Sequence, residues 1–200
     1  MANKKFLELV RNRRSIYGLD SSSPISDEVI VELISSIQRE APSAFNCQSQ
    51  RVVLLFGARH QQLWNIVKDA LRKIVPATQF KPTEDKIDSF AAGRGTLLFF
   101  DDTEVTTDLG NEYPTYRANF PIWAEQSNGM LQFAIWCQLA EVGLGASLQH
   151  YSNLIEAEVT KAFDLPSSWR LIAQMPFGGI TAAPRAKDYL PMAERLRIFH

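Results

Sequence analysis

Residues 123–151 constrain the fold of this 200-residue chain more than any other stretch. Between Glu125 and Glu141 no residue carries a charge, and large apolar side chains project in every helical direction. A helix that is apolar on all sides is buried, so we expect this one inside the core or at a contact between subunits. It is too rich in Gln, Ser and Asn to cross a membrane, which requires about 20 apolar residues.

The glycines that follow this helix indicate a change in backbone direction. Gly143 and Gly145 stand where the end of a helix needs left-handed backbone, and small and polar residues occupy 146–150. The pattern predicts that the central helix delivers an exposed backbone turn to a ligand.

Composition limits the class of protein. The 21 basic and 22 acidic residues nearly cancel, which gives no general attraction to nucleic acid or to an anionic membrane. A chain of this length can bury one good core, so we expect a single domain over residues 1–200. Cys47 and Cys137 have no metal-ligand spacing, and the N-terminus shows no secretion signal, which favours reduced thiols and a cytoplasmic location.

Hydrophobic periodicity and capping residues predict alternating helices and strands. Helices are expected at 4–13, between Ser26 and Ala41, at 59–75, from about 83, and at 156–163; strands at 51–56, 96–100 and 170–175. Residues 177–179 are expected to form a turn, and 195–199 alternate like an edge strand. Residues 101–121 are long, aromatic and rich in turn formers, which predicts an ordered lid without secondary structure.

Two basic clusters, at 11–15 and 184–188, are candidates for phosphate binding. Arginine presents a planar fork that suits phosphate, and Ser15 adds a hydroxyl. Cations also stabilise a helix C-terminus, so a solvated helix end is the alternative for the first cluster. The amide-rich loop at 42–50 is either a solvated connection or a surface that recognises a heterocycle or a polyol.

Several familiar sites are absent from the sequence. The three histidines, His60, His150 and His200, are too scattered for a zinc motif, and no G-x-S-x-G nucleophile elbow occurs, so we expect no metal site. Residues 93–96 do not match a phosphate-binding glycine loop. The remaining features suit a ligand with one phosphate, a polyol and a flat polar ring.

The order and spacing of four motifs resemble the FMN-dependent nitroreductase family. The motifs are Arg13-Arg14-Ser15, Pro42-Ser43 leading to Asn46-Cys47-Gln48, the run 143–151, and Pro176-Phe177-Gly178-Gly179. The Ser-Leu-Gln-His-Tyr run and the C-terminal pattern at 190–199 most resemble the subgroup related to fatty-acid-repression-mutant proteins. The likeness covers nearly the whole chain.

The resemblance implies an α+β fold, a mixed sheet flanked by helices, in an intertwined homodimer with FMN at the subunit boundary. By position, the implied phosphate and ribityl ligands are Arg13, Arg14, Ser15, Arg185 and Lys187. The other subunit would supply Ser43, Asn46 and Gln48. The implied flavin contacts near N5 and O4 are the backbone N–H groups around Ser147 and Leu148, with Gln149 beside them. The implied acceptor pocket on the open face of the ring is formed by Tyr113, Tyr116, Phe120, Trp123 and His150.

Two positions depart from the family pattern. Many members have Arg or Lys two residues after the serine, where this chain has Tyr17, so a cation near flavin N1 and O2 is missing there. Many members also have Gln-Pro where this chain has Gln48-Ser49, a change that relaxes the loop.

The resemblance implies that the cofactor, and no dedicated catalytic side chain, carries the chemistry. NADH or NADPH would reduce FMN and leave, and a nitroaromatic or quinone acceptor would then take the electrons, which is a ping-pong mechanism. Two alternative functions fit the same residues. One is a flavin-binding redox sensor with little turnover, and the other is a plain α/β domain that uses Arg13, Arg14 and Lys187 for an unrelated anion.

Overall fold

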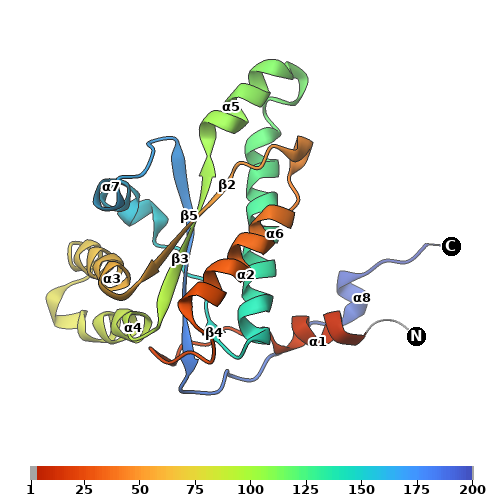
Figure 1. Cartoon of the computed structure of the whole chain (residues 1–200). Coiled ribbons are helices and arrows are strands. Elements are labelled where there is room, and N and C mark those ends of the chain that lie inside the picture. The colour runs from red at the N-terminus through yellow and green to blue at the C-terminus, as the bar shows by residue number, and fades with distance from the viewer. Residues whose placement is uncertain (1–3, 200) are drawn as a thin grey trace.

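A computed structural model describes residues 4–199. One sheet stands between two layers of helices (Figure 1). Its strands lie in the order β1-β5-β3-β2, with β4 also beside β5, and each of these pairings is antiparallel. Among the residues that the structure describes, the one parallel pairing is the bridge Ser15–Ala146. The strands are β1 Leu19–Asp20, β2 Gln50–Phe56, β3 Gly95–Asp102, β4 Gly145–Ala146 and β5 Trp169–Ile180.

The two faces of the sheet are covered by different helices (Figure 1). The first face packs against α3 Gly57–Arg72, α4 Lys81–Ala91 and α7 Ser152–Phe163, and the second against α2 Asp27–Glu40 and α6 Phe120–Glu141. The remaining elements are α1 Lys4–Asn12, α5 Thr103–Glu112, α8 Met192–Arg195, and the 3-10 turns η1 Ala44–Asn46, η2 Ala77–Gln79 and η3 Pro114–Tyr116. This arrangement confirms the α+β class and a helix-flanked sheet.

Strand β3 explains why its sequence is a continuous apolar run. Leu98 and Phe100 pack into the core under α3, α4 and α7, while Leu97 and Phe99 pack into the core under α2 and α6. Alternate side chains of a strand point to opposite faces, so a strand that is covered on both sides must be apolar at every position. The sheet is therefore buried on both faces at its centre.

The central helix, α6, is buried on one side only within a single chain. Leu131, Ile135 and Leu139 pack into the core of the sheet. Ile122, Met130 and Phe133 are 57%, 47% and 38% exposed, respectively. The side of α6 that faces the sheet is therefore buried, as expected. The opposite side is exposed, although the helix is almost uncharged. Within residues 4–199 no helix combines the length and the apolar content that crossing a bilayer requires.

The expectation of a lid without secondary structure at 101–121 is wrong. Residues 103–112 form α5 and residues 114–116 form η3. The sequence of α5 is poor in strong helix formers, so periodicity did not reveal it. Tertiary contacts hold the segment instead: Arg117 Nε donates to Gly110 O at 3.1 Å, and Gly110 is buried.

Two C-terminal expectations are also wrong. Residues 177–179 are not a turn, because β5 continues through Gly178 and Gly179 to Ile180 and pairs with β4 and β1. Residues 195–199 are not an edge strand in the single chain: α8 ends at Arg195, and the residues after it are exposed. An alternating segment becomes a strand only where a neighbouring strand offers hydrogen-bond partners, and none lies beside these residues within 4–199.

A buried histidine makes stability pH-dependent. His60 is 1% exposed; its Nε2 lies 3.0 Å from Ala91 O and its Nδ1 lies 2.8 Å from Thr96 Oγ1. Burial lowers the pKa of His60 below its usual value near 6.5. Below about pH 6.5 the unfolded chain binds a proton that the folded chain does not, so stability present above this pH is lost on acidification.

We therefore expect the free energy of unfolding to fall as pH is lowered through about 6.5, and to fall less in the His60→Gln variant. Urea unfolding at a series of pH values measures this slope. Equal slopes in His60→Gln and the wild type would contradict this explanation.

Candidate functional site

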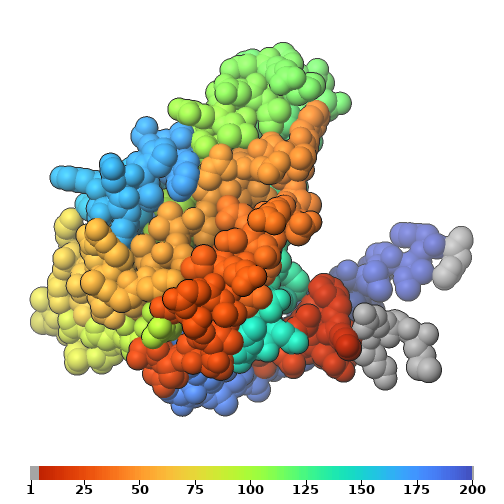
Figure 2. Space-filling view, in the orientation of Figure 1, coloured from red at the N-terminus to blue at the C-terminus, as the bar shows by residue number. Residues whose placement is uncertain are grey.

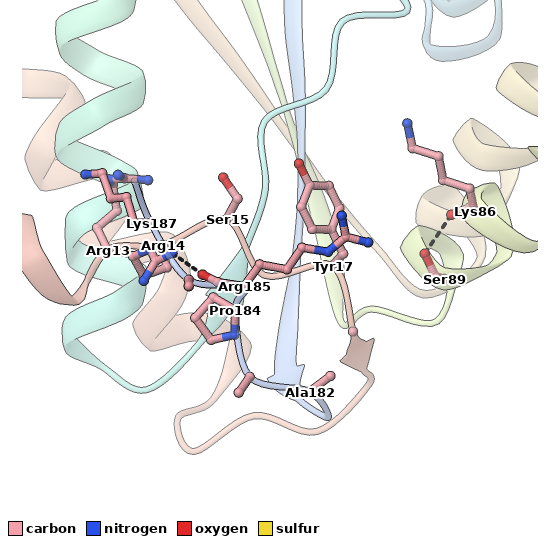
Figure 3. Close-up of a pocket in the computed structure, with 13 residues that line it drawn as sticks. Arg13, Arg14, Ser15, Tyr17, Lys86, Ser89, Ala182, Pro184, Arg185 and Lys187 are labelled. Atoms are coloured by element: carbon pink, nitrogen blue, oxygen red, sulfur yellow. Dashed lines mark hydrogen bonds between the residues drawn. The ribbon is translucent and has the colours of Figure 1, made fainter. Parts of the chain in front are cut away.

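The two basic clusters of the sequence meet around one cavity of about 810 Å³ (Figure 3). Arg13, Arg14 and Ser15 reach it from the segment after α1, and Arg185 and Lys187 reach it from the segment after β5. The structure thus brings together five residues expected to bind phosphate and ribityl oxygens, although about 170 positions separate them in sequence.

Backbone pairing explains how these distant segments meet. Ile16 N–H donates to Ala146 O at 2.9 Å, which fixes the 15–16 segment beside β4. Thr181 N–H donates to Gly18 O at 3.0 Å, and Arg14 Nη2 donates to Arg185 O at 2.5 Å. The first hydrogen bond anchors the end of α1 to the turn after α6, and the other two anchor the basic C-terminal segment to the same place.

The central helix positions one of the arginines. The Arg13 guanidinium carbon lies 4.3 Å from the centroid of the Trp136 ring, which is a cation–π distance. Trp136 belongs to α6, so the buried helix supports the cavity directly. This contact limits the rotamers of Arg13 before any ligand binds.

The charge of the cavity is of one sign. Its lining includes five cationic side chains and no carboxylate: Arg13, Arg14, Lys86, Arg185 and Lys187. Small-molecule sites are usually concavities of roughly 300–1,000 Å³, so the volume suits a cofactor-sized ligand. An acid-free cavity with three planar guanidinium groups favours a phosphate-bearing anion.

Three polar residues of this cavity were not predicted from the sequence as site residues. Lys86 and Ser89 line it from α4, and Tyr17 lies between them and Ser15 (Figure 3). Lys86 and Ser89 are three positions apart on one helix, which places them on the same face. Polar residues at this spacing are also common on helix faces that contact only water. The sequence alone therefore did not show that these two residues line a cavity.

The segment after Ala146 continues from the residue that pairs with Ser15 of the cavity. Ser147 N–H donates to Pro176 O at 3.3 Å, and Gln149 N–H donates to Gln174 O at 2.7 Å. The Gln149 side chain donates to Ser147 Oγ at 3.1 Å, so both side chains are held inside the chain. Among residues 4–199 the Leu148 N–H has no acceptor. The same holds for the His150 N–H, so these two amides of the segment are open to a ligand.

Tyr151 follows this segment and lies near Tyr17. Burial, and secondarily the neighbouring Tyr17 hydroxyl, raise the pKa of Tyr151. Its ring packs edge-on against Trp64 with centroids 6.4 Å apart. Tyr151 is therefore a neutral hydrogen-bonding group near neutral pH.

The other expected flavin contacts lie elsewhere in the single chain. The residues Ser43, Asn46 and Gln48 lie in η1 and at its two ends. Phe45 of η1 packs against Phe120 and Trp123 at the start of α6, whereas β4 follows the C-terminal end of that helix (Figure 1). A 22-residue helix is about 33 Å long, so the two regions are far apart. None of the three residues lines the basic cavity.

Phe45 organises the aromatic residues of the expected acceptor pocket. Its ring centroid lies 5.0 Å from that of Tyr113 and 5.4 Å from that of Phe120, and the rings of Tyr116 and Trp123 lie at 6.1 and 6.2 Å. Phe45, Trp123 and Met130 also line an apolar cavity of about 390 Å³. Sequence analysis missed Phe45, which joins the amide-rich loop to the aromatic cluster.

The loop that carries Phe45 has an uncommon backbone. Phe45, Asn46 and Gln48 have φ values of 57°, 51° and 51°, although none is glycine. Ser43 Oγ accepts a hydrogen bond from Gln48 N–H at 2.9 Å and closes the loop. Non-glycine residues with positive φ cost free energy and gather where function requires a fixed shape.

His150 does not join the aromatic cluster within one chain. It is exposed and lines a separate cavity of about 580 Å³ together with Arg170 and Glu125, which form an ion pair at 2.7 Å. The residues expected around an acceptor therefore fall into two places, the Phe45 cluster and the His150 cavity.

The sequence and the fold match known proteins. The nitroreductase family model matches residues 10–179. Two proteins of Saccharomyces cerevisiae, HBN1 and the nitroreductase FRM2, are 35% and 30% identical over 187 residues, which cover 92% of this chain and 93% of each relative. FRM2 is a fatty-acid-repression-mutant protein, which confirms the resemblance to that subgroup.

Solved structures agree with these matches. Nitroreductase CinD from Lactococcus lactis, in complex with chloramphenicol, is 37% identical with a TM-score of 0.90, over 98% of this chain and 100% of CinD. A second CinD structure contains 4-nitrophenol. A protein from Desulfovibrio desulfuricans in complex with FMN has a TM-score of 0.74 at 19% identity, over 100% and 99% of the two chains, which shows a shared fold.

Proposed function

The chain belongs to the nitroreductase family, and on this premise we propose that it is an FMN-dependent oxidoreductase that passes electrons from NADH or NADPH to nitroaromatic or quinone acceptors. The observation that carries the proposal is the acid-free basic cavity between the end of α1 and the segment after β5. In this proposal residues 1–200 form a single FMN-binding domain.

The residues present fit FMN. Arg13, Arg14, Arg185 and Lys187 would hold the dianionic phosphate, and Ser15 would donate to a phosphate or ribityl oxygen. The Leu148 N–H, with no acceptor among residues 4–199, would donate to the flavin ring. Leu148 is half-buried, and polar groups that are removed from water are almost always hydrogen-bonded, so its open amide is compatible with a bound ligand.

We propose that two copies of the chain complete each site. The loop with Ser43, Asn46 and Gln48 lies at the opposite end of α6 from the basic cavity, so one chain cannot use both on one flavin. Because Phe45 packs against Tyr113, Tyr116, Phe120 and Trp123, whichever subunit supplies this loop also supplies the aromatic cluster.

Exposed apolar residues support an intertwined homodimer. They lie on the open side of α6, on α1 and along the C-terminal arm, which extends away from the body beside α1 (Figures 1 and 2). Isolated apolar residues on a surface are ordinary, but an extended series of them marks an interaction surface. The series comprises Phe6, Leu7, Ile122, Met130, Phe133, Tyr189, Leu190, Met192, Leu196, Ile198 and Phe199.

Bound FMN would supply the redox chemistry by accepting a hydride from the reduced nicotinamide and giving the two electrons to the acceptor. The protein would bind the phosphate, fix the ring with main-chain N–H groups, and present an aromatic surface on which flat molecules stack. Because one flat site would serve donor and acceptor in turn, we expect ping-pong kinetics. A cytoplasmic location, where NADH and NADPH are present, belongs to the same proposal.

The test is acceptor-dependent oxidation of NADH or NADPH by the FMN-loaded protein. CinD binds 4-nitrophenol in its solved structure, so this compound and a simple quinone are suitable acceptors. We expect steady oxidation of the nicotinamide only when an acceptor is added, with parallel double-reciprocal plots. A yellow protein whose flavin is reduced but shows no acceptor-dependent turnover would favour a redox sensor over the enzyme.

Trp136 should affect the phosphate end of the cofactor through Arg13. Replacing Trp136 by Leu removes a cation–π contact worth about 0.5–1 kcal/mol, so FMN affinity should fall by roughly 2- to 5-fold. Trp136→Phe keeps an aromatic face and should lose less. Riboflavin lacks the phosphate, so its affinity should hardly change. Fluorescence titrations with both flavins measure this difference, and equal losses for FMN and riboflavin would contradict a role through Arg13.

A further inference from the structure

The His150 cavity, of about 580 Å³, differs in charge from the basic cavity. Its lining contains the carboxylates of Glu125 and Glu156, and the guanidinium of Arg170 is its one permanent cation. Arg170 Nη1 is already paired with Glu125 Oε1 at 2.7 Å. Two carboxylates beside one paired cation disfavour a phosphate. The cavity therefore suits a neutral group that donates hydrogen bonds.

A buried glutamine presents an unused acceptor to this cavity. Gln132 is 7% exposed and lines the cavity from α6. Asn128 Nδ2 donates to Phe100 O at 2.9 Å, and because that carbonyl can only accept, Asn128 turns its Oδ1 toward Gln132. Gln132 Nε2 donates to this oxygen at 2.7 Å, which fixes the amide. No donor among residues 4–199 reaches Gln132 Oε1, so this oxygen is left for a ligand.

The opposite wall of the cavity is fixed by hydrogen bonds between α7 and β5. Glu156 Oε2 accepts a hydrogen bond from Leu171 N–H at 2.7 Å. Ser152 Oγ donates to Ile172 O at 2.9 Å. All four of these residues line the cavity. Its walls are therefore held in place by the fold before any ligand binds.

The cavity begins where the segment with open amides ends. Ser147 N–H and Gln149 N–H donate to carbonyls of β5, whereas the N–H groups of Leu148 and His150 have no acceptor among residues 4–199. Because successive groups of an extended segment point in opposite directions, the two open amides point away from β5. His150 also lines the cavity. If the flavin ring lies along these amides, a molecule stacked on the ring can place a second part in the His150 cavity.

We propose that the His150 cavity receives the adenosine end of the reduced dinucleotide, and that Gln132 Oε1 accepts a hydrogen bond from the adenine amino group. This inference rests on the proposed function. The carboxamide of nicotinamide also carries an NH₂ group, but a cavity of about 580 Å³ is within the range of sites for whole small molecules and is larger than one amide requires. The nicotinamide would stack on the flavin, and the adenosine would bind beside α7.

The test compares NADH with reduced nicotinamide mononucleotide, which carries the same nicotinamide without the adenosine. Gln132→Leu removes the acceptor, and the loss of one hydrogen bond between neutral groups should lower kcat/KM for NADH by about 3- to 10-fold. The value for reduced nicotinamide mononucleotide should not change. Calorimetric titration of the FMN-loaded protein with ADP-ribose, which has the adenosine but no nicotinamide, should show the same loss of affinity.

Two further variants make the test specific. Gln138→Leu is the matched control: Gln138 is a half-buried glutamine of the same helix that does not line the cavity, so both donors should react as in the wild type. Gly129 lines the cavity, and a Cβ there would meet no atom within 4 Å. Gly129→Leu should therefore fill part of the cavity without disturbing Asn128, and it should impair NADH alone. This variant carries the test if thermal unfolding shows that Gln132→Leu is not folded.

The ratio of kcat/KM for the two donors decides the outcome. A ratio that falls in Gln132→Leu and in Gly129→Leu supports the proposal. An equal loss for both donors would assign the amino group to the carboxamide and overturn the adenosine site, as would an unchanged ratio in Gly129→Leu. A wild-type protein that oxidises neither donor would overturn the proposed function and this inference together.

Discussion

Replacing Arg13 by Gln is expected to weaken FMN binding by about 10- to 100-fold, which corresponds to losing a charge-assisted hydrogen bond worth about 1.5–3 kcal/mol. Arg13 lines the basic cavity and is held against Trp136 at 4.3 Å, so it meets the phosphate without first losing much rotamer freedom. Isothermal titration of the flavin-free protein with FMN measures the loss directly.

Arg11 provides a matched control for this experiment. It is an exposed arginine in the last turn of α1, two positions before Arg13, and it does not line the cavity. Arg11→Gln should therefore leave the FMN affinity within about two-fold, since an exposed charge contributes little. Riboflavin should bind both variants alike. If Arg11→Gln and Arg13→Gln were equally impaired, a general positive field would explain the binding better than a built phosphate site.

Gly178→Ala is expected to destabilise the fold by about 3 kcal/mol or more, because the new methyl has no room. A Cβ built at Gly178 would lie 2.1 Å from Asp20 O and 2.8 Å from Arg94 N, and both are backbone atoms. Relief requires that β1 or the 93–94 segment move. For a chain of this size the melting temperature should fall by about 6–12 °C, measured by calorimetry.

The same displacement should reach the cavity, because β1 continues from the segment that carries Ser15 and Tyr17. Gly178→Ala should therefore also weaken FMN binding. Gly129→Ala tests whether any added methyl is harmful: at Gly129, an exposed position of α6, a Cβ would meet no atom within 4 Å. Alanine favours helix over glycine by about 1 kcal/mol, so this variant should melt no lower than the wild type. Similar melting of the two variants would contradict the packing argument.

The glycines at 178 and 179 also show what the sequence could not reveal. Gly-Gly is common in turns, and the sequence predicted a turn, but these residues continue β5 because β1 and the 93–94 segment pack against them too closely for a side chain. Close packing between segments distant in sequence is a tertiary property. The order and approximate position of the main helices and strands were predictable, because they follow hydrophobic periodicity and capping.

The candidate site, too, was predictable from the sequence only in part. Arg13, Arg14, Ser15, Arg185 and Lys187 were identified from composition and family resemblance, and the structure gathers them around one cavity. Lys86 could not be identified, because a lysine on a solvated helix looks the same whether it faces a ligand or water. Phe45 was not predicted, because neither its positive φ nor the contacts of its ring with four other aromatic residues can be read from the sequence.

The central claim is that FMN binds between two copies of this chain, with its phosphate in the basic cavity. The most direct measurement is gel filtration of the FMN-incubated protein, with the flavin and the protein quantified in each fraction and the mass obtained by light scattering. We predict a yellow dimer that carries one FMN per chain. A colourless monomer, from which all added FMN separates, would contradict it.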